Sequence, residues 1–562
     1  MSGFSQKRIA MLGWGLVTCL ALLVWRLSVI QIAEHERLAA ANARQVSVSV
    51  SLEEVPRGNI LDRNGVPLTG FERADRIVVI PQLLEDRAKV AEELAAVLDV
   101  PRGEVETALE SACCLPYNLD VRQKKLIQAS RRPGVYVAEV VLRYGENQRA
   151  SHLIGYVGPI ASTEELNSLR QYGKPYRLGD LVGKSGLEKY YEPDLKGLYP
   201  VKTARCYVDA CGKPLPGLGY VEGKERDTGR RDLILTIDRE FQQAVEDVLD
   251  RHMVSGAVVV MDVQTGDVLA MASRPVFDPR RPGEALKETE AFVNHALALY
   301  QPGSVFKTVV AAAALERGIV RPDSEFVCAG RGEQLIACWK DEGHGRLTFA
   351  DAFANSCNPT FAKVALKLGA DGIIEYARRL GLGEQRLLGF PYPPDPRQDL
   401  DMIAEPHNLV NAAIGQGPVL VTPLQVASMV AAIANDGVYR VPRLVREVRQ
   451  GGTVLRIVTA DQGKRAVSPG TAATLRELMT LVTTAGNGRG GYLAGPGSAG
   501  KTGTAQVGDG TRTSGWFAGY FPLDRPRFAI VVLAENAESG GKTAAPLFRE
   551  IARAIIEQGG LP

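Results

Sequence analysis

The residues best suited to chemistry stand in the stretch Gln301-Pro-Gly-Ser-Val-Phe-Lys-Thr-Val-Val-Ala-Ala-Ala-Ala-Leu315. Pro302 and Gly303 interrupt the chain, and the mostly apolar run after them predicts a loop that enters a buried helix. Ser304 then stands at the helix start, with Lys307 one turn later on the same face. A lysine in an apolar setting gives up its proton more easily and activates a serine hydroxyl. Because N–H groups at a helix start also stabilise an oxyanion, the stretch offers a nucleophile, its base and part of an oxyanion hole.

The same spacing also has an ordinary structural explanation. Serine is a favoured helix N-cap, and a lysine one turn later is common on any helix. Ser-x-x-Lys occurs again at Ser498/Lys501 and at Ser539/Lys542, so the pattern alone is weak. Only Ser304 is followed by a long apolar helix, whereas the other two serines stand among glycines. The assignment of Ser304 therefore depends on partners elsewhere in the chain.

Two other groups supply such partners. Ser356 and Asn358 form the only Ser-x-Asn of the chain, and Lys501 begins its only Lys-Thr-Gly. A hydroxyl and an amide two residues apart on a loop can face one cleft, where the first relays protons and the second binds a substrate amide. On an edge strand, Lys501 offers a charge, Thr502 a hydroxyl for a substrate carboxylate, and Gly503 room for close approach.

Taken in this order, the three groups resemble the motifs of the penicillin-binding proteins, and the chain is most similar to the monofunctional class B members that act in elongation, division and sporulation. The resemblance covers nearly the whole chain. Further stretches carry it: Pro56–Gly65 and Gly186–Tyr190 resemble the N-terminal pedestal motifs, and Gly415–Gly417, Thr422–Gln425 and Gly515–Gly519 resemble landmarks of the transpeptidase domain. No stretch resembles the glycosyltransferase domain of the bifunctional class.

The resemblance implies acyl transfer on peptidoglycan stem peptides that end in D-Ala-D-Ala. It assigns Ser304 as nucleophile, Lys307 as base and the backbone N–H groups of Ser304 and Thr504 as the oxyanion hole. It further implies that Ser356 passes a proton to the leaving D-Ala, that Asn358 holds the peptide, and that Lys501, Thr502 and Thr504 bind the terminal carboxylate. An amine of a neighbouring peptidoglycan strand then takes the acyl group from the enzyme and forms the cross-link, and β-lactams stop the reaction at the acyl stage. No cofactor is implied, and the implied partners are a polymerising membrane glycosyltransferase and a second copy of the chain.

Other functions share some of these residues. A membrane-anchored β-lactamase or a β-lactam sensor has the same serine and lysines but differs in the fate of the acyl-enzyme. A catalytically silent scaffold is disfavoured because all three motifs are intact. Gly495-Pro-Gly-Ser-Ala-Gly-Lys-Thr502 fits the nucleotide-binding P-loop, yet neither a hydrophobic strand before it nor a helix after it is indicated. A Ser-His-Asp hydrolase is weaker still, since no Gly-x-Ser-x-Gly occurs.

The net charge and the N-terminal segment indicate where in the cell the protein acts. A formal net charge of +2 on 562 residues gives no electrostatic reason to expect a nucleic-acid partner. Residues 9–32 are apolar enough to span a bilayer, and Lys7 and Arg8 precede them. Basic residues before the span favour a cytoplasmic tail, and no small-x-small cleavage site follows it. We therefore expect a single-pass anchor in the cell membrane, with the remainder extracellular or periplasmic.

The eight cysteines fit no zinc-binding pattern, since the chain has neither Cys-x-x-Cys nor His-Glu-x-x-His. The sequence therefore predicts no metal site. Disulfides are permitted in an exported domain, and Cys206–Cys211 or a pair among Cys328, Cys338 and Cys357 remain open. Cys357, between Ser356 and Asn358, is predicted as a small buried side chain. The alternative is a Cys338–Cys357 bridge that would make activity redox-dependent.

A chain of this length predicts more than one domain. We expect a cytoplasmic tail (1–8), a transmembrane anchor (9–32), an N-terminal pedestal or dimerisation domain (33–228) and a transpeptidase domain (229–562). The last should be an α+β or α/β fold with an antiparallel sheet flanked by helices. Strands are predicted at 45–52, 233–238 and 527–534, a hairpin at 256–272, a helix at 239–252 and helical structure over 83–130. Strands at both ends of the last domain suggest one sheet built from distant segments.

Overall fold

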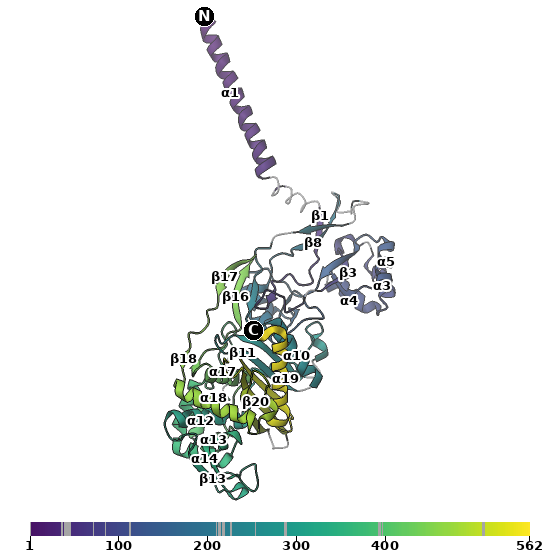
Figure 1. Cartoon of the computed structure of the whole chain (residues 1–562). Coiled ribbons are helices and arrows are strands. Elements are labelled where there is room, and N and C mark those ends of the chain that lie inside the picture. Colours follow the sequence, from purple (N-terminus) through teal and green to yellow (C-terminus); the bar gives the residue numbers. More distant parts are fainter. Residues whose placement is uncertain are drawn as a thin grey trace. The chain divides into compact units, whose positions relative to one another are not determined.

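The computed structural model describes residues 2–34, 38, 47–70, 72–84, 86–111, 114–209, 211, 215, 220–224, 227–252, 255–285, 289–391, 395, 397–507 and 512–561 (Figure 1). The chain forms two compact units. The first comprises residues 1–56, 72–143 and 198–227, and the second comprises 57–71, 144–197 and 228–562. Parts of the predicted pedestal segment, 57–71 and 144–197, thus pack with the second unit. The assignment of 33–228 to a single domain stays a prediction.

The N-terminus is one long apolar helix. Helix α1 (Ser2–Ser28) continues into a π-helical turn (Val29–Ala33), and Arg8–Ala33 forms a stretch of 26 residues with a hydropathy of 2.0. None of this stretch is buried within the protein, and its length suffices to cross a bilayer. Its bounds agree with the predicted anchor at 9–32. The sequence also predicts a helix at 34–43, and of these residues only Glu34 and Leu38 are among those described.

The first unit contains two small sheets. One has the order β1 (Ser47–Ser51), β8 (Lys202–Tyr207), β9 (Val221–Lys224), and the other has the order β4 (Cys114–Asn118), β3 (Arg73–Val79), β5 (Val135–Val141). Helices α3 (Arg87–Leu98), α4 (Arg102–Ser111) and α5 (Val121–Ser130) supply side chains to the same apolar core as β3 and β5. Strand β1 confirms the predicted strand within the described residues. The helical prediction for 83–130 was wrong at 114–118, which is an edge strand.

One sheet of the second unit combines strands from distant parts of the chain. Its order is β17 (Thr453–Ile457), β16 (Val445–Gln450), β10 (Asp232–Leu235), β2 (Ile60–Leu61), which brings the motif at 56–65 beside the strand predicted at 233–238. Nearby lie α6 (Ser151–Ile154), β6 (Val157–Pro159), α7 (Thr163–Arg170), β7 (Leu181–Gly183), α8 (Gly186–Tyr190) and α9 (Glu192–Leu195). The buried Arg57 pairs with Glu188 at 2.8 Å and with Glu192 at 2.6 Å, so two sequence motifs meet in one ion-pair cluster.

The main sheet of the second unit is five-stranded and antiparallel. Its order is β12 (Val268–Arg274), β11 (Gly256–Asp262), β21 (Phe528–Glu535), β20 (Arg512–Phe521), β19 (Ala499–Val507). The hairpin and the late strand predicted from the sequence are both confirmed and adjacent. Strand β19, which carries Lys501, is an edge strand as expected.

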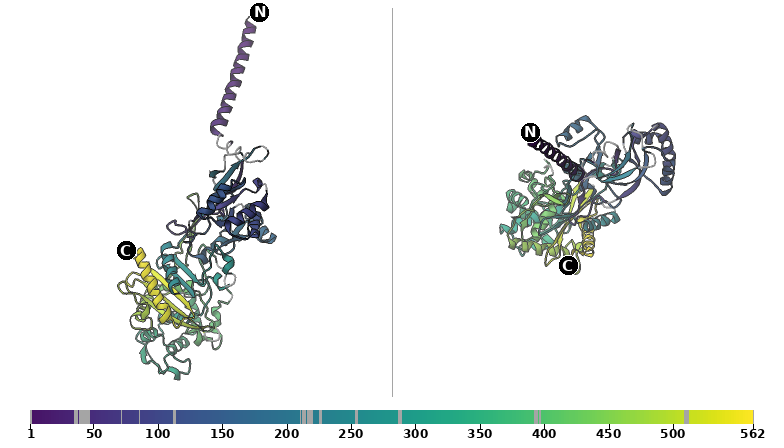
Figure 2. Two further views of the ribbon diagram at one scale, coloured as in Figure 1. Left: turned by 90° about the vertical axis from the view of Figure 1, so that its right-hand side faces the viewer. Right: turned by 90° about the horizontal axis from the view of Figure 1, so that it is seen from above.

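Helices lie against the sheet (Figure 2). Alternate residues of its strands belong to two different apolar cores. Val258, Val260 and Val532 pack with α10 (Arg239–His252) and α19 (Ala545–Ile555). Ala257, Val259 and Leu533 belong to the core on the other side, which includes α17 (Pro423–Ala434). This period of two is that of a sheet covered on both faces. Other elements of the unit are α11 (Pro282–Ala285), α12 (Lys307–Glu316), β13 (Glu325–Cys328), β14 (Gly345–Thr348), α13 (Phe349–Ala354), α14 (Asn358–Leu368), α15 (Ala370–Arg379), α16 (Asn408–Ala412), β15 (Val438–Tyr439), β18 (Lys464–Arg465) and α18 (Pro469–Thr484).

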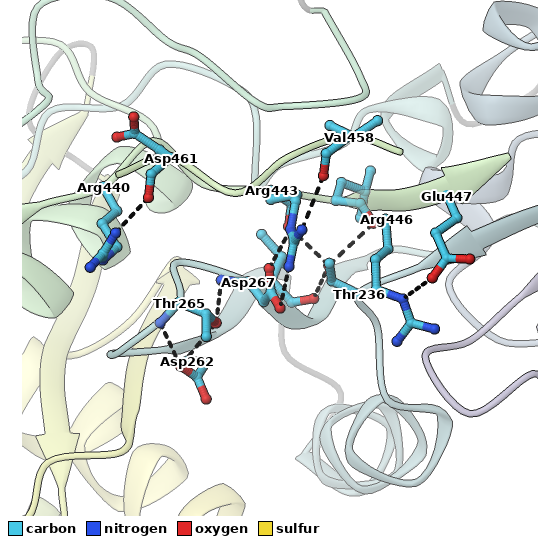
Figure 3. Close-up of polar contacts among 12 residues, drawn as sticks. Thr236, Asp262, Thr265, Asp267, Arg440, Arg443, Arg446, Glu447, Val458 and Asp461 are labelled. Atoms are coloured by element: carbon cyan, nitrogen blue, oxygen red, sulfur yellow. Dashed lines mark hydrogen bonds and ion pairs between the residues drawn. The ribbon is translucent and has the colours of Figure 1, made fainter. Parts of the chain in front are cut away.

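A largely buried ion pair links the turn of the β11–β12 hairpin to the segment that enters β16 (Figure 3). The guanidinium of Arg443 donates to both carboxylate oxygens of Asp267, at 2.7 and 3.0 Å, and to the carbonyl of Val458 at 3.0 Å. Thr236 donates to the carbonyl of Arg443 at 2.9 Å and to that of Val268 at 2.7 Å. The pair therefore joins three parts of the chain.

Replacement of Asp267 by Ala should destabilise the second unit by about 3–5 kcal/mol, because it leaves the largely buried Arg443, whose side chain is only 13% exposed, without its counter-charge. The double variant Asp267→Leu/Arg443→Met should recover most of this loss. Glu284→Ala is the control, since Glu284 and Arg281 form an ion pair with side chains 72% exposed. Calorimetric unfolding checks all three, and an unchanged transition in Asp267→Ala would contradict the expectation.

Candidate functional site

Ser304 and Lys307 stand where a tight turn becomes a helix. Gly303–Phe306 is a single 3-10 turn, and α12 begins at Lys307. Ser304 is half-buried and reaches the cleft described below, whereas Lys307 is fully buried. Gly303 has φ +53°, and a Cβ there would lie 2.6 Å from the carbonyl oxygen of Thr504, so the turn passes very close to β19. The predicted loop, helix start and buried helix are confirmed.

The amine of Lys307 is directed at the Ser356–Asn358 turn. It donates to the Ser356 carbonyl at 2.7 Å, to the Ser356 hydroxyl at 3.2 Å and to Asn358 Oδ1 at 2.6 Å. No hydrogen bond joins Lys307 to the Ser304 hydroxyl within the described part of the chain. Hydrogen bonds between catalytic groups are often long before substrate binds, so this spacing does not count against the pair. Because Lys307 contacts the Ser356 hydroxyl, that hydroxyl is placed where it could pass a proton between Ser304 and Lys307.

Burial changes the acidity of the Lys307 amine. Desolvation lowers the pKa of Lys307 from 10.5 to about 7, because little water is left to solvate the ammonium. The ring of Phe361 lies below the amine, with its centroid 5.4 Å away. A lysine with such a pKa is partly neutral near pH 7 and is able to accept a proton.

Ser356 joins the two lysines of the site. It lies between α13 and α14 with φ +55°, a conformation that is strained for a residue with a Cβ and that recurs at functional sites. Its hydroxyl accepts hydrogen bonds from Lys307 at 3.2 Å and from Lys501 at 3.0 Å. Asn358 is the first residue of α14, and its amide donates to the carbonyl of Ala337 at 3.4 Å. The structure thus brings together groups that are distant in sequence.

Lys501, Thr502, Gly503 and Thr504 follow one another along β19. Lys501 is fully buried, and burial together with the nearby charge of Lys307 lowers its pKa well below the usual value. The Thr502 hydroxyl donates to Asn487 Oδ1 at 2.8 Å, and the Thr504 hydroxyl accepts from the N–H of Gly540 at 3.1 Å. A Cβ at Gly503 would lie 2.6 Å from the carbonyl oxygen of Pro302, so glycine allows β19 to pass close to the Ser304 turn.

A cleft of about 1100 Å³ opens above these groups. Six of the eight predicted site residues line it, namely Ser304, Ser356, Asn358, Thr502, Gly503 and Thr504. The other two, Lys307 and Lys501, are buried beneath Ser356. Sequence reasoning missed Asn487, which also lines the cleft and holds Thr502; no motif marks it. Ser304, the two buried amines and the hydroxyls of Thr502 and Thr504 therefore surround one space.

The P-loop-like run and the cysteines can be compared directly with the structure. The P-loop-like run at 495–502 leads into strand β19 rather than a helix, so the N-terminal helix dipole that binds phosphate is missing there. Cys206, Cys211, Cys328, Cys338 and Cys357 are all free thiols, and neither Cys206–Cys211 nor Cys338–Cys357 is bridged. Cys357 is buried, as predicted.

The expectation of no metal site stays a prediction, and one cluster of side chains bears on it. Cys328, Cys338, His344 and Cys357 place their ligand atoms within 4.8 Å of one another, so they form a group able to hold a metal ion. The spacing of these residues matches no short motif, because the fold rather than a local turn brings them together. The only signal in the sequence was the crowding of three cysteines and one histidine into residues 328–357.

The antiparallel sheet, the serine at a helix start and the two buried lysines fit the class of protein that the sequence resemblance implies. Residues 256–553 match the family of the penicillin binding protein transpeptidase domain, and residues 52–224 match the penicillin-binding protein dimerisation domain. The chain therefore belongs to the penicillin-binding proteins. The predicted fold class is confirmed.

Individual relatives agree with this assignment. The chain is 30% identical to stage V sporulation protein D of Bacillus subtilis (strain 168), over 95% of this chain and 83% of the relative. It is 29% identical to the peptidoglycan D,D-transpeptidase MrdA of Acinetobacter baumannii, over 94% of this chain and 84% of the relative. A solved structure described as the structural coordination of polymerization and crosslinking by a peptidoglycan synthase complex matches with a TM-score of 0.67 and 28% identity, over 97% of this chain and 98% of the other. The D,D-transpeptidase domain of a peptidoglycan glycosyltransferase from Eggerthella lenta matches with a TM-score of 0.55 and 28% identity, over 64% and 96%.

Proposed function

We propose that the chain is a membrane-anchored serine D,D-transpeptidase that cross-links peptidoglycan stem peptides. The observation that supports it most is the Ser356 hydroxyl held between the amines of Lys307 and Lys501, at 3.2 and 3.0 Å, below a cleft that Ser304 lines. One hydroxyl in contact with two buried amines is a proton relay, and a second hydroxyl in the open cleft is a nucleophile. The relatives named D,D-transpeptidases support the same reaction.

In the acylation step, the Ser304 hydroxyl oxygen attacks the carbonyl carbon of the penultimate D-Ala. Its proton passes to neutral Lys307, directly or through the Ser356 hydroxyl. The backbone N–H groups of Ser304 and Thr504 stabilise the negative oxygen of the tetrahedral intermediate. The C–N bond then breaks, and the terminal D-Ala leaves with a proton delivered through Ser356, so that Lys307 is neutral again.

The remaining residues bind and orient the donor peptide. Thr502 and Thr504 hydrogen-bond the terminal carboxylate, whose charge also favours the protonated form of Lys501. Asn358 binds a backbone amide of the stem peptide through its own side-chain amide. In the second step an amine of a neighbouring peptidoglycan strand attacks the acyl carbon and forms the cross-linking amide bond. The Ser304 oxygen leaves and takes up the proton that the amine loses, so the hydroxyl is restored.

The rest of the chain delivers this domain to the cell wall. We place residues 1–8 in the cytoplasm, 9–32 across the membrane, 33–228 as a pedestal or dimerisation domain and 229–562 outside as the transpeptidase domain. The structural relative from a peptidoglycan synthase complex supports a polymerising membrane glycosyltransferase as partner, and the matched dimerisation domain supports a homodimer.

A fluorescent penicillin tests the proposal on the full chain in detergent. We expect one label per chain, stable for many minutes, and an adduct that peptide mass mapping locates at Ser304. A label that is released within minutes would instead indicate a β-lactamase, and an unlabelled chain would indicate a scaffold. Stable labelling without cross-linking of pentapeptide substrates would indicate a sensor, so each of these outcomes contradicts the proposal in a different way.

A further inference from the structure

A second groove of the second unit is lined mainly by cations. It has a volume of about 520 Å³ and lies where the end of α15, the turn after it and the short β15–β18 pair come together. The described residues that line it include the cations Arg378, Arg379, Arg386, Lys464 and Arg465 and one carboxylate, Glu384. None of these residues lines the catalytic cleft. Because the whole chain has a net charge of only +2, the positive charge is concentrated at this groove.

Two of the five cations are already paired with carboxylates. Arg378 Nη2 lies 2.7 Å from Asp401 Oδ2. Arg379 Nη2 lies 2.7 Å from Glu375 Oε1. These two guanidinium groups have their counter-charges at hand, so they contribute little net charge to the groove.

The other three cations form no ion pair with a carboxylate of the described residues. The guanidinium of Arg465 donates to the carbonyls of Asp436 and Val467, at 2.9 and 3.4 Å, which holds the group in place and leaves its charge uncompensated. Arg386 and Lys464 are exposed, and their side chains have no hydrogen-bond or ion-pair partner within the part of the chain that the structure describes. A cleft lined by charges of one sign concentrates the opposite ion. The groove therefore favours an anion.

Tyr439 adds a neutral donor to these cations. It is the register partner of Lys464 in the β15–β18 pair, so the two side chains lie on the same face. Burial raises the pKa of Tyr439 to about 12 against the opposing effect of the Arg386 charge, so the phenol stays protonated. A Cβ at Gly381 would lie 2.2 Å from the Tyr439 ring, so the ring packs directly on the turn. Among the described residues the hydroxyl has no hydrogen-bond partner, and it is free to donate.

The backbone of the turn offers further donors. The N–H groups of Gly383, Glu384 and Arg386 lie outside helices and strands and donate to no described carbonyl or side chain. All three residues line the groove. Backbone N–H groups that a turn leaves without partners form concavities that bind anions. The turn thus supplies neutral donors beside the charged ones.

Phosphate is the anion that best fits this set of donors. A guanidinium fork matches two oxygens of a phosphate, and a phosphate accepts more hydrogen bonds than the two oxygens of a carboxylate. A volume of about 520 Å³ lies within the range of about 300–1,000 Å³ that is usual for small-molecule sites. The groove is therefore large enough for a phosphate that is part of a larger molecule.

We propose that this groove binds a phosphate group, with Arg386, Lys464 and Arg465 as its charged ligands and Tyr439 as a hydroxyl donor. Free phosphate and a phosphodiester polymer share this chemistry, and titration with both separates them. The site is distinct from the catalytic cleft, and its binding of phosphate does not depend on the proposed transpeptidase reaction.

Calorimetric titration of the full chain in detergent tests the site with inorganic phosphate, glycerol 3-phosphate and poly(glycerol phosphate). We expect saturable binding that weakens with salt. Affinity for the polymer about tenfold or more above that for inorganic phosphate would identify a polymer as the source, and equal affinities would identify the free ion. Polyglutamate, the carboxylate control, should bind about tenfold more weakly than the polymer. Absence of saturable binding by all three phosphate probes would overturn the proposal, and so would polyglutamate binding as tight as theirs.

Variants of the groove locate the bound phosphate. Arg386→Gln/Lys464→Gln should weaken phosphate binding by about 10–100-fold and leave the fold intact, since both side chains are exposed and have no partner in the described chain. Tyr439→Phe should weaken it by a smaller factor. Glu384→Gln should strengthen it, because it removes a negative charge beside the anion. The control is Arg281→Gln, at a side chain 72% exposed outside the groove, which should bind as the unaltered chain does.

Two results of the variant series would show that phosphate binds elsewhere. One is unchanged affinity in the double variant of Arg386 and Lys464. The other is a loss of affinity in Glu384→Gln equal to that of the double variant. Either result would overturn the proposal even if the unaltered chain bound phosphate.

Discussion

Ser304→Ala should abolish covalent capture of β-lactams and reduce cross-linking by on the order of 10⁶-fold, since the acyl group has no oxygen left to which it can transfer. The fold should be unaffected. Ser304 is half-buried at the floor of an open cleft, and no side-chain hydrogen bond of the described chain depends on it. Non-covalent binding of substrate should persist, because the carboxylate-binding hydroxyls on β19 remain. Labelling by fluorescent penicillin and mass spectrometry of the intact chain measure the loss.

Ser539→Ala is the matched control for this experiment. Ser539 also lies in a Ser-x-x-Lys sequence and lines the same cleft, but its hydroxyl caps a helical turn by accepting from the N–H of Lys542 at 3.2 Å. Its loss should cost about 1 kcal/mol of stability and leave labelling in place. If Ser304→Ala still formed the adduct and Ser539→Ala did not, the assignment of the nucleophile would be wrong.

The sequence predicted those parts of the site that local chemistry determines. A Pro-Gly break followed by an apolar run marks the start of a buried helix, so the positions of Ser304 and Lys307 at that start could be predicted from the local sequence. Lys501 was expected on an edge strand, and β19 is the edge of the five-stranded sheet. Strongly apolar segments such as 528–535 were recognisable because a strand covered on both faces is apolar throughout.

The features that were missed depend on tertiary contacts. The four candidates for metal binding, Cys328, Cys338, His344 and Cys357, come from a strand end, a loop and a helix start, and no local spacing marks them. Strand β4 was assigned to helix because it is short and follows two helices; Pro116 is tolerated in it because β4 is an edge strand. Residues 57–71 and 144–197 pack with the second unit through contacts such as the buried Arg57–Glu188 pair, and a sequence shows no sign of such partners.

The protonation of Lys307 and that of Lys501 depend on each other. Both are buried, and both donate to the one hydroxyl of Ser356, so two full charges there would repel each other at short range. Burial lowers the pKa of each, and the charge of Lys307 lowers that of Lys501 further. The pair therefore holds fewer than two protons near neutral pH. That state leaves a lone pair free to accept the proton of the nucleophile.

The rate of acylation should consequently rise with pH through about 7, because the reactive form is neutral Lys307 and burial lowers its pKa from 10.5 to about 7. Below that pH the rate should fall about tenfold per pH unit, and above it the rate should level off. Were the amine to keep its ordinary pKa, the rate would instead continue to rise between pH 8 and 10. Stopped-flow acylation with a penicillin whose own charge is constant over this range distinguishes the two profiles.

Lys307→Arg should remove the rise and lower the acylation rate by about 10²–10⁴-fold at every pH, since a guanidinium stays protonated throughout the accessible range. The positive charge remains, on a side chain somewhat larger than that of lysine, so a loss of this size reports the missing proton acceptor rather than a missing cation. Lys184→Arg, at a lysine that pairs with Glu165 away from the cleft, should leave the pH profile unchanged. If Lys307→Arg kept the profile of the unaltered chain, the base would have to be another group, and the amine of Lys501, which also contacts Ser356, would be the residue to test next.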